Sequence, residues 1–102
     1  MIQSIELECL EFIESDKSFV LATYYEIGSG EITEQTFDAK KMYKDLVAMN
    51  LINLQCEIEG IQTSEPLPFS AMEMYINEME FQMQEQLLAD YLLYKDIQKR
   101  LN

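Results

Sequence analysis

The chain has 102 residues, 48% hydrophobic and 25% charged, and its formal net charge is −12. This composition is typical of one globular domain and is too apolar for a disordered chain. Only 7 residues are Lys or Arg, and a duplex binder needs many such cations to neutralise phosphates. Direct binding to nucleic acid or to an anionic membrane is therefore strongly disfavoured.

The acidic residues are concentrated in two parts of the chain. Residues 1–36 carry a net charge of −7 and residues 66–93 carry −5, whereas residues 94–102 carry +2. The N-terminus is acidic, unlike a signal peptide, and no apolar run reaches the roughly 18 residues of a membrane helix. We therefore expect a cytoplasmic protein. The isolated Cys9 and Cys56 are interpreted as reduced core residues.

The first segment fits two periodicities. Ile5, Leu7 and Cys9 alternate with glutamates, as in a strand, and Leu10 and Phe12 continue the alternation if one residue bulges near Cys9. A helical stripe also fits, but that helix would place Leu7 on its wet face. We therefore favour a strand.

A turn over residues 15–18 precedes a second strand, Phe19–Ile27. Both faces of this strand are mostly apolar, which predicts a central strand covered on both sides. Gly28–Gly30 is typical of a hairpin loop, and a third strand is expected from about Glu31 to Thr36.

Asp38 is a plausible N-cap for a helix that ends at about Asn50. Leu51–Ile61 alternates apolar and polar residues and predicts a fourth strand. Gly60–Phe69, which holds both prolines, is expected to be a loop.

The C-terminal third predicts one uninterrupted helix. Ser70–Glu73 matches a capping box, and neither Gly nor Pro follows up to Leu101, so a helix of about 30 residues and about 45 Å is expected. The order β-β-β-α-β-α predicts a single α+β domain over residues 1–102, with a small mixed or antiparallel sheet packed by helices.

This helix would carry two apolar stripes. The first is expected to face the core and consists of Met72, Ile76, Met79, Met83, Leu87, Tyr94, Ile97 and Leu101. The second lies nearly opposite and consists of Met74, Phe81, Leu88 and Leu92. Either the second stripe packs inside the domain or it is a partner surface, and we predict that it forms a homodimer.

Acidic residues are also expected to gather on the sheet. If the first and fourth strands share one sheet, its outer face carries Glu6, Glu8, Glu57 and Glu59. Such a cluster either serves solubility alone or imitates phosphates and competes for a basic groove on a partner.

Nothing in the sequence indicates catalysis. The chain has no His, the commonest general base and a frequent metal ligand, and it has no glycine-rich phosphate loop and no calcium loop. We therefore expect that the chain is not an enzyme, that it has no catalytic or metal-binding residues and that it uses no cofactor.

In size, acidity and lack of catalytic groups the chain is similar to phage-encoded inhibitors, including anti-CRISPR and other DNA-mimic proteins. This similarity implies a non-enzymatic acidic inhibitor that binds the nucleic-acid site of a nuclease or DNA-binding protein. The alternative is a generic adaptor or oligomerisation module.

Overall fold

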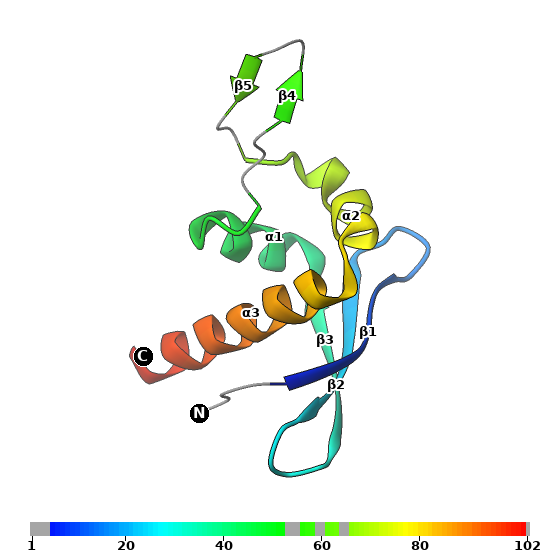
Figure 1. Ribbon diagram of the computed structural model, residues 1–102, viewed down its shortest axis with the longest axis vertical. Helices are drawn as coiled ribbons and strands as arrows, with labels where there is room; N and C mark the ends of the chain where they lie inside the picture. The colour runs from blue at the N-terminus through cyan, green and yellow to red at the C-terminus, as the bar shows by residue number, and fades with distance from the viewer. Residues whose placement is uncertain (1–4, 53–55, 59–60, 64–65, 102) are drawn as a thin grey trace.

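Three antiparallel strands form the main sheet, and three helices pack on one of its faces (Figure 1). The computed structural model describes the backbone of residues 5–52, 56–58, 61–63 and 66–101, and the side chains of residues 5–52 and 66–101. The elements are β1 (Ile5–Ile13), β2 (Phe19–Glu26), β3 (Ile32–Asp38), α1 (Ala39–Ala48), β4 (Cys56–Ile58), β5 (Ile61–Thr63), α2 (Phe69–Glu78) and α3 (Phe81–Leu101). The predicted α+β class with a long C-terminal helix is confirmed.

A β-bulge in β1 decides which of its side chains face the core. The register between β1 and β2 shifts between Leu7 and Cys9, as the sequence predicted. Leu7 and Leu10 are three residues apart, so a regular strand would send them to opposite faces. The extra residue at the bulge lets both point inward, and both are buried.

The central strand β2 is covered on one face only. Val20, Ala22 and Tyr24 are buried, whereas Leu21 and the other side chains of the opposite face are partly or fully exposed. The prediction that this strand is covered on both sides was therefore wrong. Apolar residues on both faces of a strand indicate burial on both faces only when enough chain remains to build a second covering layer.

Hydrogen bonds cap both ends of α1, from a side chain at its start and within the backbone at its end. The Asp38 side chain accepts a hydrogen bond of 2.9 Å from the Lys41 N–H, which confirms the predicted N-cap. Asn50 has a left-handed backbone with φ of 60°. The Leu51 N–H then donates to the Leu46 carbonyl at 2.9 Å and the Asn50 N–H to the Val47 carbonyl at 3.0 Å. This pair of bonds is a Schellman motif with asparagine in the place of glycine.

The predicted fourth strand, Leu51–Ile61, is wrong. Ile52 is buried in the core, and the Leu67 N–H donates to its carbonyl at 3.0 Å. Between these two residues the described segments β4 and β5 pair with each other in a separate two-stranded antiparallel sheet (Figure 1). The sequence alternation there reflects this hairpin, not a strand of the main sheet.

The predicted continuous helix and its capping box are also wrong. Pro68 is the N-cap of α2 without a side-chain cap hydrogen bond, and the helix ends where Met79 adopts extended backbone with ψ of 142°. Gln84 of α3 donates from Nε2 to the Ile76 carbonyl at 2.6 Å. A side chain from the next helix thus adds a second hydrogen bond to a carbonyl that already accepts one of 3.2 Å from the Met79 N–H, and the chain turns here without Gly or Pro.

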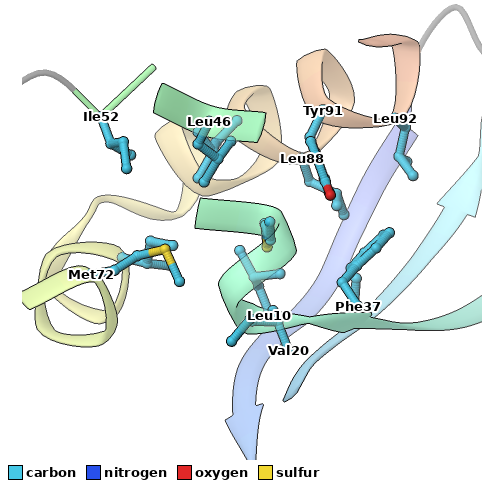
Figure 2. Close-up of a cluster of buried hydrophobic side chains, with 14 of the residues drawn as sticks. Leu10, Val20, Phe37, Leu46, Ile52, Met72, Leu88, Tyr91 and Leu92 are labelled. Atoms are coloured by element: carbon cyan, nitrogen blue, oxygen red, sulfur yellow. The ribbon is translucent and has the colours of Figure 1, made fainter. Parts of the chain in front are cut away.

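The break gives each helix its own core-facing side (Figure 2). Met72 and Ile76 of α2 are buried, as predicted, but Met83 and Ile97 of the same expected stripe are 53% and 46% exposed. The buried side of α3 consists of Leu87, which belongs to that stripe, and of Leu88, Tyr91 and Leu92. The first stripe is thus confirmed at Leu87 but not at Met83 and Ile97, because it assumed one helical phase across the break.

Two further observations concern the surface of the described residues. None of the helices in this part of the chain combines the length and apolar character needed to cross a membrane. Cys9 is a free, exposed thiol, so its assignment to the core was wrong; it lies at the bulge, where the inward positions are taken by leucines. The Cys56 side chain lies outside the described side chains.

The two helix starts predict different responses to mutation. Asp38→Ala should lower the free energy of unfolding by about 1 kcal/mol, because α1 loses its N-cap acceptor. Ser70→Ala should change it by less than about 0.5 kcal/mol, because the serine is exposed and makes no cap bond. Urea unfolding measures both. Asp38→Asn, which keeps an acceptor, is the control, and equal losses in the two alanine variants would contradict this assignment.

Candidate functional site

The helices leave one face of the main sheet uncovered, and we call it the open sheet face. Its residues follow from strand alternation opposite the buried row, and they come from all three strands. They are Glu6, Cys9, Glu11, Ile13, Phe19, Leu21, Thr23, Tyr25, Ile32, Glu34, Thr36 and Asp38.

Strand register places carboxylates on both sides of an apolar central strip. Tyr25 of β2 lies between Glu6 of β1 and Ile32 of β3. One residue pair further along the sheet, Thr23 lies between Cys9 and Glu34. Adjacent strands are about 4.8 Å apart, so the two edges of this face are about 10 Å apart, and the strip between them is one strand wide.

The strip exposes more apolar surface than solubility requires. Phe19 is 38% exposed, Ile32 is 54% exposed, and Ile27 in the adjoining turn is 65% exposed. Aromatic and aliphatic side chains that line up on an exposed sheet are typical of the centre of a protein interface.

The charge of this face has a single sign. The three strands contain no Lys or Arg, and Glu6, Glu8, Glu11 and Glu34 are all exposed. Asp38 is exposed too, although its carboxylate also caps α1. The face therefore attracts cations through solvent, with an apolar strip at its centre.

The four predicted acidic residues do not form one cluster on the main sheet. Glu6 and Glu8 are on β1, Glu8 at the bulge. Glu57 is in β4, which pairs with β5 and belongs to a different sheet, and Glu59 lies outside the described residues. The assumption that the first and fourth strands share a sheet was therefore wrong. The acids that sequence reasoning missed are Glu11 and Glu34, which the strand alternation around the bulge could have identified.

The second predicted site, the helix stripe, is divided by the helix break. Leu88 and Leu92 are 0% and 4% exposed and belong to the core, so they cannot contact a partner. Met74 and Phe81 are 64% and 51% exposed and remain available. What is left is two exposed apolar side chains, one in the middle of α2 and one at the start of α3.

A buried carboxylate joins α1 to α3 behind the sheet. Asp45 is 5% exposed; it accepts hydrogen bonds from the Tyr91 hydroxyl at 2.9 Å and from the Lys41 ammonium at 2.8 Å. Burial, followed by the bond to Asp45, raises the pKa of Tyr91 above its ordinary value. The separate hydrogen bond between Lys41 and Asp45 raises the pKa of Lys41. A buried carboxylate needs such partners, and here they are complete.

No group of three or more His, Cys, Asp or Glu side chains in the described part of the chain is arranged to hold a metal ion. Comparisons of the chain with protein-family models, with curated proteins and with solved structures find no match. The candidate site is therefore defined by its own geometry and charge.

Tyr91→Phe tests the buried network. Near pH 8 it should lower the free energy of unfolding by about 1–3 kcal/mol, because buried Asp45 loses a donor. A free tyrosine ionises near pH 10, and Tyr91 ionises higher in the folded chain. The unfolded state therefore loses its proton first, and stability falls as pH rises above about 10.

Urea unfolding at pH 8 and pH 10.5 measures both effects. The fall between these pH values should be smaller in Tyr91→Phe than in the wild type. It should not vanish, because burial also raises the pKa of Tyr24. An equal fall in both proteins would show that Tyr91 does not contribute.

Proposed function

We propose that the chain is a non-enzymatic acidic inhibitor that binds a basic protein surface through its open sheet face. The observation that carries the proposal is the combination of one-signed charge with a central apolar strip. The partner class that fits is a nuclease or DNA-binding protein whose nucleic-acid groove offers Lys and Arg around an accessible apolar floor.

The charges support attraction to such a partner in two ways. A field of one sign speeds the encounter with a basic groove, and it excludes acidic surfaces. The apolar strip then provides area whose burial gives affinity at short range, at roughly 25 cal/mol per Å² of apolar surface before the costs of association. Carboxylates alone would speed association without adding much affinity, and the apolar strip alone would discriminate little between partners.

The chain itself is not proposed to bind nucleic acid. A net charge of −12 opposes the approach of a polyanion, and the open sheet face offers it no cation. The proposed inhibitor would instead compete with nucleic acid for the partner.

Charge removal on the open sheet face tests the proposal. Glu6→Gln combined with Glu34→Gln removes one carboxylate from each edge strand. Partner binding should fall at least about tenfold, equivalent to about 1.4 kcal/mol, while stability should hold or rise slightly because like-charge repulsion is relieved. The matched control is Glu78→Gln with Glu80→Gln, two exposed acids around the end of α2, which should bind as the wild type does.

The partner is found and tested with the same three proteins. Immobilised wild type and both variants are incubated with nuclease-treated extract of the native cell, and the captured proteins are identified and challenged with duplex DNA. The proposal predicts that the wild type and the Glu78→Gln, Glu80→Gln control capture the same partner proteins. The Glu6→Gln, Glu34→Gln variant should not capture them, and duplex DNA should displace them from the wild type. Equal capture by the sheet variant, or complexes that DNA leaves intact, would refute it.

A second candidate function is an oligomerisation module. The observation that favours it is the exposure of Met74 in α2 and of Phe81 at the start of α3, since exposed large apolar side chains on helices are available to a partner. The second candidate takes these two side chains as one patch, and a second copy of the chain is the simplest partner for it.

Phe81→Glu tests the homodimer. If two copies associate through this patch, light scattering at high micromolar concentration should give a dimer mass for the wild type and a monomer mass for the variant. Ile97→Glu is the control, because Ile97 is 46% exposed on the same helix but far from the turn. A monomeric wild type would remove this candidate.

A further inference from the structure

One pocket lies on the helical side of the molecule, away from the open sheet face. Its volume is about 570 Å³, within the range of about 300–1,000 Å³ typical of small-ligand sites. The pocket lies between the inner face of the sheet, α1 and the C-terminal half of α3. Its polar or aromatic lining includes Tyr24, Glu26, Lys41, Tyr94, Lys95 and Lys99.

Cations are concentrated in this pocket. The whole chain has 7 Lys and Arg residues, and Lys41, Lys95 and Lys99 all line it. Lys95 and Lys99 are one helical turn apart and share a face of α3, where like charges repel. Within the described part of the chain, neither forms an ion pair. A bound anion would relieve their repulsion.

Most of the carboxylates at the pocket are already neutralised. Asp45 is paired with Lys41 at 2.8 Å, and Asp96 is paired with Arg100 at 3.1 Å. This leaves Glu26 as the carboxylate without an ion-pair partner among the described residues, against Lys95 and Lys99, whose ammonium groups form no ion pair there. With three lysines and three carboxylates the lining is formally neutral, in a chain whose net charge is −12.

The uncharged walls restrict the shape of the ligand. Leu92 and the rings of Tyr24 and Tyr94 line the same pocket, and they offer apolar and aromatic surface to a flat body. The Lys95 ammonium lies 5.4 Å from the centroid of the Tyr91 ring and 5.5 Å from that of Phe37. These cation–π contacts stabilise the Lys95 ammonium over the two rings. Glu26 can accept a hydrogen bond from a hydroxyl or amino group.

We propose that this pocket binds a small phosphorylated organic anion with a flat body, the chemistry of a mononucleotide. The phosphates are held by Lys95 and Lys99, and the flat body lies against the tyrosines. Longer nucleic acid is excluded because its further phosphates would meet the acidic surface outside the pocket.

Isothermal titration with ADP tests the proposal on the full chain. ADP should bind with a Kd below about 1 mM, pyrophosphate should bind more weakly, and adenosine should not bind measurably. Lys99→Gln should weaken ADP at least about tenfold. Lys44→Gln is the matched control, because it removes the same charge from an exposed position of α1 outside the pocket, and it should bind as the wild type does.

Three results would overturn the proposal: no ADP binding at 1 mM, equal weakening by Lys44→Gln, or adenosine binding as tightly as ADP. Circular dichroism and melting confirm that each variant is folded. The Glu6→Gln, Glu34→Gln protein should bind ADP like the wild type, so the outcome is independent of the function proposed for the open sheet face.

Discussion

Burial of a single face of a three-stranded sheet is the constraint on which the rest of this structure depends. The row Val20, Ala22 and Tyr24 of the central strand is at most 2% exposed, and all three helices contribute to the core that covers it. A chain of this size has enough residues to build one such core. The opposite face consequently stays in contact with solvent, and its side chains are free to serve solubility or recognition.

Two local irregularities make that single core possible. The bulge in β1 turns both Leu7 and Leu10 inward, where a regular strand would present only one. The break between α2 and α3 lets each helix present a different side to the sheet, and Gln84 satisfies a carbonyl near that break at 2.6 Å. Glu85 of α3 also accepts a hydrogen bond of 2.9 Å from the Leu7 N–H of the edge strand β1. These two side-chain hydrogen bonds tie α3 to the end of α2 and to the edge strand β1.

Charge is distributed between the two sides of the molecule. The strands of the sheet carry acids and no Lys or Arg, whereas the basic residues of α1 and α3 approach each other around the pocket. The buried Asp45, bonded to Tyr91 and Lys41, lines this pocket and links α3 to α1. The face proposed for a basic protein and the pocket proposed for a small anion therefore use different residues.

The sequence by itself determined the features that depend on neighbouring residues: the strands up to Asp38, the bulge near Cys9, the glycine hairpin, the N-cap of α1 and the overall acidity. These follow from alternation, turn chemistry and capping, which act over a few residues. Tertiary structure alone decided the helix break, the burial of Leu88 and Leu92, and the separation of β4 from the main sheet. The break has no Gly or Pro to indicate it and is supported by Gln84 from the following helix. The open sheet face could likewise be predicted only in part. Glu6 and Glu8 could be identified as acidic residues of a strand. Their neighbours depend on which strands pair, and that pairing is set by a core that forms between residues distant in the chain.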